Sequence, residues 1–182
     1  KYILVALKDE LPDHDLDSSE YQVWYTGVGK INAAMWATMA CIQHDCETVI
    51  NYGTAGSLNN ELIDKLVQVG QVKQRDMDAR PVSDLGITPF EELGTPGTIV
   101  IGTSPHTLST GDNFVKEKPE LESDIVDMEA YAIAKICKLK NIKFECYKYI
   151  TDYTNENSNN DWNRNISKGA QLFLEKFPDC KI

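Results

Sequence analysis

Short apolar runs alternate with segments of helical periodicity along the whole chain. Apolar runs bounded by Gly, Pro, Asn or charged residues are typical of buried strands. They predict strands at Tyr2–Leu7, Gln22–Tyr25, Glu47–Tyr52, Val67–Val72, Thr98–Gly102, Ile125–Val126 and Phe144–Ile150. The strand at 47–52 is predicted to end at a glycine turn, GTAGS (53–57), and the stretch 82–96, with several Gly and Pro residues, is predicted to be a loop.

Helical spacing predicts three longer helices. One follows the turn TGVGK (26–30), one runs from Met128 to about Leu139, and the last runs from Trp162 to Lys176 before Pro178. Their predicted inner faces include Ile31, Ala34, Met35, Thr38, Met39 and Ile42 in the first helix, and Ala132, Ile133, Ile136 and Cys137 in the second. A short helix is predicted around Pro119–Leu121. The alternation of strands and helices indicates a single α/β domain over residues 1–182 with a predominantly parallel sheet.

Charge narrows the class of ligand. The chain has 28 acidic and 18 basic residues, a net charge of −10, and its only arginines are Arg75, Arg80 and Arg164. A protein that binds the nucleic-acid backbone normally carries a basic patch, and the same holds for an anionic membrane. We therefore expect a small, weakly charged ligand, with neither nucleic acid nor membrane as a partner.

The five cysteines are scattered, at Cys41, Cys46, Cys137, Cys146 and Cys180. They form no CxxC motif, and the three histidines have no zinc spacing, so no metal site is expected. Cys41 and Cys137 fall within predicted helices, where we expect buried structural thiols. The lack of a disulfide framework, a signal peptide and a run of about 20 apolar residues predicts a cytoplasmic protein.

Candidate catalytic groups follow the predicted strands, because ligands of parallel α/β sheets bind beyond the carboxyl ends of the strands. Glu10 follows the first strand and is a candidate general base, although the sequence alone favours a surface acid. Asp152 follows the strand at 144–150, where apolar surroundings suit a proton donor. Asp127 and Glu129, on either side of Met128, can cap the next helix or bind two adjacent hydroxyl groups.

The glycine-rich segments carry weaker signals. GVGK matches neither the phosphate loop nor the G-x-G-x-x-G motif, because the glycine spacing differs and Ile31 and Asn32 occupy the positions of the hydroxyl residue and the final glycine. We predict a tight strand-to-helix turn there. In GTAGS, backbone N–H groups and the Thr54 hydroxyl can bind an anion or a sugar hydroxyl.

The order of six motifs along the chain is a more specific signal than any single motif. They are ALKDEL (6–11), TGVGK (26–30), INYGTAGS (50–57), STGDNFV (109–115), VDMEAYAIA (126–134) and YITDY (149–153). In this order they resemble the nucleoside phosphorylase/nucleosidase superfamily, and within it the 5′-methylthioadenosine/S-adenosylhomocysteine nucleosidases. The resemblance extends from Tyr2 to about Leu174 and implies a shortened member with a three-layer α/β fold, in which helices flank a mixed, largely parallel central sheet.

The resemblance implies hydrolysis of the N-glycosidic bond of 5′-substituted adenine nucleosides (methylthioadenosine, S-adenosylhomocysteine or 5′-deoxyadenosine) without a cofactor. It makes Glu10 the base that activates water and Asp152 the acid that protonates adenine at N7, a pairing of two carboxyl groups with opposite roles. Glu129 holds the 2′ and 3′ hydroxyls of the ribose. The other substrate contacts that the resemblance implies are Thr54, Ala55, Gly56, Phe114, Val115, Asp127 and Met128.

The resemblance further implies a homodimer. The middle loop, Arg80–Phe90, is expected to contribute to the interface, because Leu85, Ile87 and Phe90 are otherwise exposed apolar residues. Less chain than usual is found between Leu11 and Gln22 and around 82–95, so the preference for the 5′ substituent does not follow from the resemblance.

Two other functions fit parts of the same pattern. A phosphorylase of the same superfamily uses phosphate in place of water and places arginines around the anion, whereas the first loop here reads Lys8-Asp9-Glu10. A catalytically silent nucleoside-binding domain has no need of a water-activating acid at Glu10. Hydrolysis is therefore favoured, with Lys148 standing where the superfamily usually has an arginine near the water.

Overall fold

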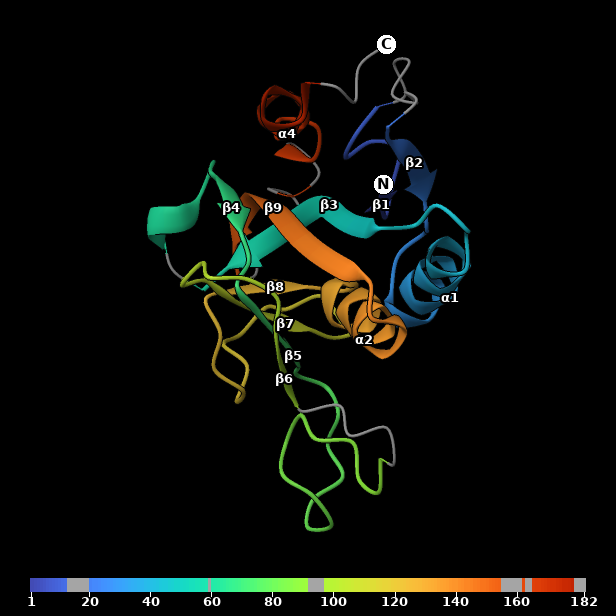
Figure 1. Cartoon of the computed structure of the whole chain (residues 1–182). Coiled ribbons are helices and arrows are strands. Elements are labelled where there is room, and N and C mark those ends of the chain that lie inside the picture. Colours follow the sequence, from blue (N-terminus) through green and yellow to red (C-terminus); the bar gives the residue numbers. More distant parts are fainter. Residues whose placement is uncertain (13–19, 59, 92–96, 155–161, 163–164, 179–182) are drawn as a thin grey trace.

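The computed structural model describes residues 1–12, 20–58, 60–91, 97–154, 162 and 165–178. Within them, nine strands form one sheet (Figure 1): β1 (Tyr2–Val5), β2 (Gln22–Tyr25), β3 (Thr48–Ser57), β4 (Leu66–Gln68), β5 (Gln71–Gln74), β6 (Thr98–Val100), β7 (Thr107–Thr110), β8 (Ile125–Asp127) and β9 (Lys143–Tyr153). The helices are α1 (Lys30–Cys41), η1 (Asn60–Leu62, a 3₁₀ turn), α2 (Ala130–Lys140) and α4 (Ala170–Lys176).

The long strand β3 is the centre of the sheet. One of its edges pairs in parallel with β1 over its first half and antiparallel with β8 at its end, while β9 runs parallel along the other edge. The strand order is β2-β1-β3-β8-β7-β5-β6, and β4 extends the sheet beyond β9. Parallel pairs outnumber antiparallel ones, so the predicted mixed, largely parallel sheet is confirmed.

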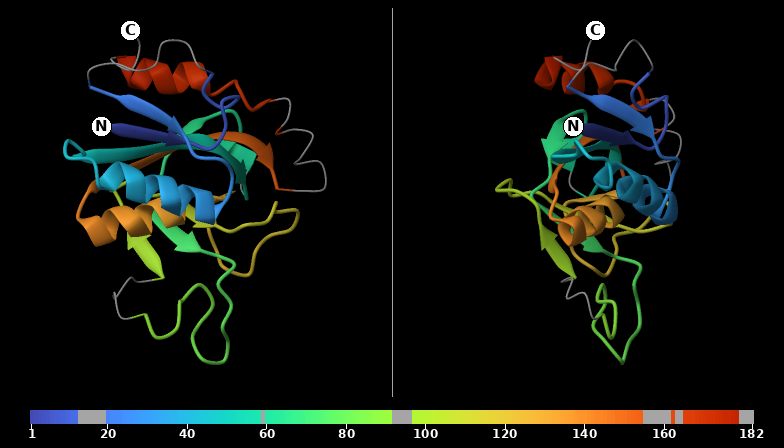
Figure 2. Two further views of the ribbon diagram at one scale, coloured as in Figure 1. Left: turned by 90° about the vertical axis from the view of Figure 1, so that its right-hand side faces the viewer. Right: turned by 45° about the vertical axis from the view of Figure 1, so that its right-hand side comes forward.

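Two apolar cores lie on the two faces of the sheet. Successive side chains of a strand point to opposite faces, and in β1 Tyr2 and Leu4 pack in one core while Ile3 and Val5 pack in the other. Figures 1 and 2 show α1 and α2 side by side on one face and α4 on the opposite face. Phe173 of α4, fully buried, belongs to the second core. The three-layer arrangement is therefore confirmed.

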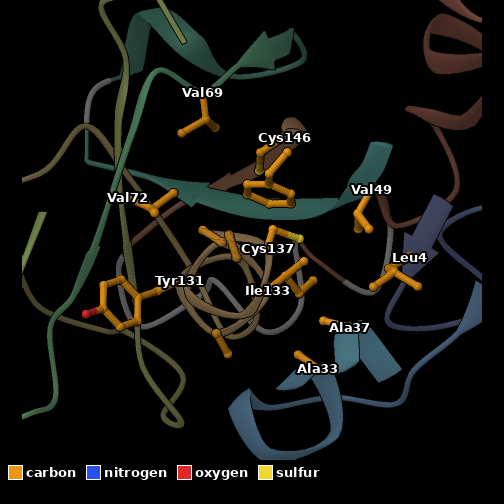
Figure 3. Packing of buried hydrophobic residues seen from close by; sticks show 14 of the residues in the cluster. Leu4, Ala33, Ala37, Val49, Val69, Val72, Tyr131, Ile133, Cys137 and Cys146 are labelled. Carbon is orange, nitrogen blue, oxygen red and sulfur yellow. The ribbon is translucent and has the colours of Figure 1, made fainter. Parts of the chain in front are cut away.

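The inner face that periodicity predicts for the first helix is wrong. α1 packs against α2 with the fully buried Ala33, Ala37 and Ala40, whereas Ile31 is 84% exposed and Met35 53% exposed. Figure 3 shows Ala33 and Ala37 pointing toward Ile133 of α2. Alanines on one face let two helices pack closely, so the large apolar side chains of α1 are left on its outer side.

The predicted inner face of the second helix is confirmed, and with it part of the prediction about thiols. Ala132, Ile133 and Cys137 of α2 are buried. Cys41, at the end of α1, is only half-buried, and its Sγ lies 3.9 Å from that of Cys137. One of the two predicted structural thiols is thus buried and the other lies at the edge of the helix pair.

Several predicted elements have different bounds. GTAGS is not a turn but the fully buried second half of β3. The predicted strand 67–72 is two strands, because the chain turns at Gly70, where a Cβ would lie 1.8 Å from the carbonyl oxygen of Ser104. Residues 119–121 are not helical. At the carboxyl end, α4 covers only residues 170–176 of the predicted helix, part of which lies outside the described residues.

Candidate active site

A cavity of about 240 Å³ opens where β3 parts from β1 and joins β8. All ten site residues predicted from the sequence line it: Glu10, Thr54, Ala55, Gly56, Phe114, Val115, Asp127, Met128, Glu129 and Asp152. Their elements are far apart in the sequence, and the sheet brings them together at the ends of β1, β3, β8 and β9. This is the position that parallel α/β sheets offer to a ligand.

Glu10 is buried at one side of the cavity, so the surface-acid interpretation is wrong. A tight turn, with the Glu10 N–H bonded to the Leu7 carbonyl, folds the side chain back toward β3. Its Oε1 accepts hydrogen bonds from the backbone N–H and the hydroxyl of Thr54, both at 2.7 Å, and its Oε2 accepts one from the Leu7 N–H at 3.0 Å. Three donors around one carboxyl group suit an ionised acceptor, the form that a general base requires.

Asp127 is held by three donors. Its Oδ1 accepts the Thr110 hydroxyl at 2.6 Å, and its Oδ2 accepts the Ala130 N–H at 2.8 Å and lies 2.9 Å from Nζ of Lys148. The contact with Ala130 caps the first turn of α2, which is the structural role weighed in the sequence. Asp127 therefore lines the cavity while its oxygens fix the start of α2 and neutralise a buried lysine.

Lys148 is fully buried within β9, close to the carboxylates of Asp127 and Glu10. Burial by itself lowers the pKa of a lysine, but here the carboxylate of Asp127 raises it above its usual value, so the side chain stays charged. Gly53 leaves the space for this arrangement, because a Cβ there would lie 3.2 Å from Oε1 of Glu10 and 3.4 Å from Nζ of Lys148.

Glu129 is a buried carboxyl group that accepts a hydrogen bond from a glycine turn. It precedes α2, and its Oε1 accepts the N–H of Gly29 at 2.9 Å. Burial, together with the nearby carboxylate of Asp127, raises its pKa from 4.5 to about 8. The turn 27–29, where Gly27 and Gly29 have positive φ angles of 79° and 96°, thus places a backbone donor in the site.

Asp152 lies near the end of β9, where it pairs with Gly56 of β3. The register shifts between Ala55 and Gly56, so that Ala55 pairs with Ile150 and Gly56 with Asp152. Such a bulge changes the direction of the side chains that follow it. A Cβ on Gly56 would lie 3.0 Å from Oδ2 of Asp152, and the Thr151 hydroxyl donates to Oδ1 at 2.7 Å. Asp152 is 4% exposed and belongs to β9, which continues beyond the end at Ile150 that the sequence predicts.

Apolar side chains form the remaining walls of the cavity. Phe114, Val115, Val126 and Met128 line it, and the ring of Trp162 meets that of Phe114 edge-on, with the ring centroids 6.5 Å apart. A cavity with apolar walls and a few buried polar groups is typical of a site for a small, flat ligand.

Sequence comparisons relate the chain to known proteins. A family model described as the phosphorylase superfamily matches residues 16–96. The 5′-methylthioadenosine/S-adenosylhomocysteine nucleosidase of Bacillus pumilus is 28% identical over 80% of this chain and 73% of its own length. The chain is therefore similar to the phosphorylase superfamily over residues 16–96 and, at low identity, to nucleosidases over most of its length.

Solved structures share the fold of this chain. The futalosine hydrolase of Helicobacter pylori has a TM-score of 0.82 at 20% identity, covering 98% of this chain and 95% of that one. The nucleosidase of Colwellia psychrerythraea, solved in complex with adenine, has a TM-score of 0.82 at 17% identity, covering 100% and 96%. At these identities the structures establish the fold.

Sequence reasoning did not select eight of the residues that line the cavity, among them Val28, Arg75 and Trp162. Val28 belongs to the turn that we predicted to be structural. Arg75 is buried, and its guanidinium donates to the backbone carbonyls of Ser109, Asp127, Gly111 and Asn113 at 2.7, 2.7, 3.0 and 2.7 Å. Trp162 is the third of the residues named. Its signal was a single aromatic residue within the polar stretch 154–165, but nothing in the sequence indicates what it contacts.

Two features are absent from the part of the chain that the structure describes. There, His, Cys, Asp and Glu residues form no group of three that could hold a metal ion. No helix among these residues is long and apolar enough to cross a bilayer.

Glu129→Gln is expected to make the folded chain more stable at high pH. The pKa of Glu129 rises from 4.5 to about 8 on folding, so between these pH values the folded chain keeps a proton that the unfolded chain releases. The stability linked to this proton is therefore full below about pH 4.5 and is lost as the pH rises to 8. Glutamine mimics the protonated form. One pKa unit corresponds to about 1.4 kcal/mol, so we expect the variant to gain about 1 kcal/mol or more at pH 8.

Urea unfolding at pH 5, 6.5 and 8 measures this effect. The difference between Glu129→Gln and the parent chain should grow with pH. Glu117→Gln, a substitution of an exposed residue, controls for the loss of one negative charge. A Glu129→Gln variant whose stability relative to the parent is the same at all three pH values contradicts the prediction.

Proposed function

We propose that the chain hydrolyses the N-glycosidic bond of 5′-substituted adenine nucleosides, such as methylthioadenosine, S-adenosylhomocysteine or 5′-deoxyadenosine, and releases adenine. The observation that carries the proposal is the position of two buried carboxyl groups on the strands that flank β3. Glu10 follows β1 and contacts Thr54, and Asp152 lies on β9 opposite Gly56. The Cα atoms of positions 54 and 56 are about 7 Å apart along β3. In the proposed reaction, the water molecule and the sugar carbon lie between the two carboxyl groups.

Each carboxyl group has a distinct task in this reaction. Asp152 donates a proton to N7 of adenine as the bond between N9 and C1′ breaks, and the electron pair of that bond stays with the base. Water adds to C1′ and transfers a proton to Glu10. Glu129 holds the 2′ and 3′ hydroxyls, and Phe114 and Val115 contact the purine. General acid or base catalysis of this kind contributes roughly 10²–10⁴-fold for each group.

The state of the buried cations supports water over phosphate as the attacking group. Arg75, the cationic residue among the described residues that line the cavity, already donates to four backbone carbonyls, and Lys148 is paired with Asp127. A phosphate dianion beside Glu10 would meet a second negative charge and no free guanidinium. A silent binding domain is less well supported, because binding alone does not require four buried carboxyl groups in one cavity.

Adenine release in phosphate-free buffer tests the proposal. We expect free adenine from methylthioadenosine without added phosphate, and no increase in rate when phosphate is added. Futalosine, S-adenosylhomocysteine and 5′-deoxyadenosine in parallel reactions identify the 5′ substituent that the site accepts. Strict dependence on phosphate, with a ribose 1-phosphate as product, would sink the hydrolase assignment, and binding of methylthioadenosine without any product would favour the silent domain.

The proposed assembly is a homodimer, as the superfamily resemblance implies. Two surfaces have exposed apolar side chains: the middle loop, where Phe90 is 90% exposed, and the outer side of α1, with Ile31, Met35, Met39 and Ile42. Burial of such a surface is favourable in water. We expect light scattering at micromolar concentration to give the mass of a dimer. Met35→Glu should produce a monomer if the outer side of α1 forms the interface, and Phe90→Glu should do so if the middle loop forms it. A parent chain that is monomeric contradicts the proposal.

A further inference from the structure

A chain of hydrogen bonds leads from Trp162 to Glu10. The indole N–H of Trp162 donates to Oγ1 of Thr54 at 2.9 Å, and the Thr54 hydroxyl donates to Oε1 of Glu10 at 2.7 Å. An indole nitrogen is only a donor, so Oγ1 of Thr54 must accept from it, and the single hydroxyl hydrogen is left to point at Glu10. The chain therefore has one direction, from the indole to the carboxylate.

We propose that Trp162 is a positioning residue for the water-activating carboxylate, acting through the Thr54 hydroxyl; this inference rests on the proposed function of Glu10. A free hydroxyl rotates to suit its surroundings. Because the indole N–H occupies one lone pair of Thr54 Oγ1, the Thr54 hydroxyl keeps its hydrogen directed at Oε1 of Glu10. Polarisation along this chain of hydrogen bonds strengthens the bond to Glu10. Oε2, which accepts only the Leu7 N–H among the contacts described above, keeps a lone pair for water.

The indole itself is held in place from two directions. Its N–H is bonded to Thr54, which lies in the fully buried strand β3, and its ring meets the ring of Phe114 edge-on. Both contacts face the cavity, which Trp162 lines together with Phe114. The same side chain therefore forms a wall of the substrate site and orders the hydroxyl beside the base, two roles that substitutions can separate.

Trp162→Phe separates the two roles, because it keeps an aromatic wall and removes the N–H donor. We expect kcat for adenine release to fall about 3- to 10-fold, the range of one net hydrogen bond, with KM changed less than about 3-fold. Phe114→Leu alters the wall and leaves the hydrogen bonds, so it should act mainly on KM. Trp36→Phe, which removes an indole on the outer helix α1, is the matched control and should leave both constants unchanged.

A double-mutant cycle with Thr54→Val tests whether the effect passes through the hydroxyl. Valine has a similar shape without the hydroxyl, so Trp162→Phe should change kcat no further in the Thr54→Val background. If Trp162→Phe lowers kcat by the same factor in both backgrounds, Trp162 only packs against the ligand and the proposal is overturned.

A spectroscopic readout keeps the inference testable apart from the enzyme assay. The chain has three tryptophans, so its indole N–H signals can be assigned in a ¹H–¹⁵N spectrum with Trp162→Phe and Trp36→Phe. We expect Glu10→Gln and Thr54→Val each to move the Trp162 signal and not those of the other two. A Trp162 signal that neither variant moves overturns the inference, even where adenine release is normal. If the Trp162 signal moves but no nucleoside gives a product, the hydrogen-bond chain is established. The proposed function is then rejected, and with it the positioning role of Trp162 in catalysis.

Discussion

Asp152→Asn is expected to lower kcat for adenine release by at least about 10²-fold, because it removes a proton donor and keeps the shape of the side chain. Adenine leaves poorly as an anion, so protonation at N7 contributes in the transition state more than in the bound ground state. The Thr151 hydroxyl, which donates to Oδ1, can still donate to the amide oxygen. We therefore expect a folded variant in which KM changes much less than kcat.

Steady-state assays and thermal unfolding of the same preparations check this prediction. Asp45→Asn is the matched control: Asp45 accepts a hydrogen bond from the Tyr2 hydroxyl at 2.9 Å and is not among the residues of the cavity. It should keep its kcat. If Asp152→Asn has a normal kcat and only a lower melting temperature, Asp152 has a structural role at the end of β9 and is not the acid.

The fold and much of the cavity could be predicted because they depend on features that repeat along the chain. Strands are short apolar runs, and the polar residues after them meet at one end of the sheet through the parallel pairing itself. Glu10, Glu129 and Asp152 illustrate this: each follows or ends an apolar run, and each lines the cavity. The order of the motifs then related these residues to a superfamily.

Three of the errors concern contacts between distant segments. α1 has apolar residues on both sides, and only the position of α2 decides that Ala33 and Ala37 face inward. Glu10 reads as a surface acid until β3 supplies the Thr54 donors, 44 residues further along the chain. Trp162 contacts Thr54 across 108 residues. Periodicity describes one element at a time and contains no information about such pairs.

Glu10→Gln is expected to lower kcat at least about 10²-fold, by a route that differs from that of Asp152→Asn. The amide cannot accept a proton from water, so the base is lost. It is also held less well: the carboxylate accepts from Thr54 on one oxygen and from the Leu7 N–H on the other, and a glutamine must turn its NH₂ group toward one of these donors. A buried donor that faces another donor costs about 1–3 kcal/mol, so we expect a lower stability as well.

Adenine binding distinguishes this loss from a general collapse of the site. In the proposed reaction Glu10, which accepts hydrogen bonds from Thr54 and Leu7, acts on the water, whereas Phe114 and Val115 contact the purine. Calorimetric titration of Glu10→Gln with adenine should therefore give a Kd within about 3-fold of the parent value, since less than one net hydrogen bond to the base is changed. Asp152→Asn, in contrast, alters the group that faces N7 and should weaken adenine binding more. If Glu10→Gln loses adenine binding together with kcat, the division of tasks between the two carboxyl groups is incorrect, because a group that acts only on water has no direct contact through which to hold the base.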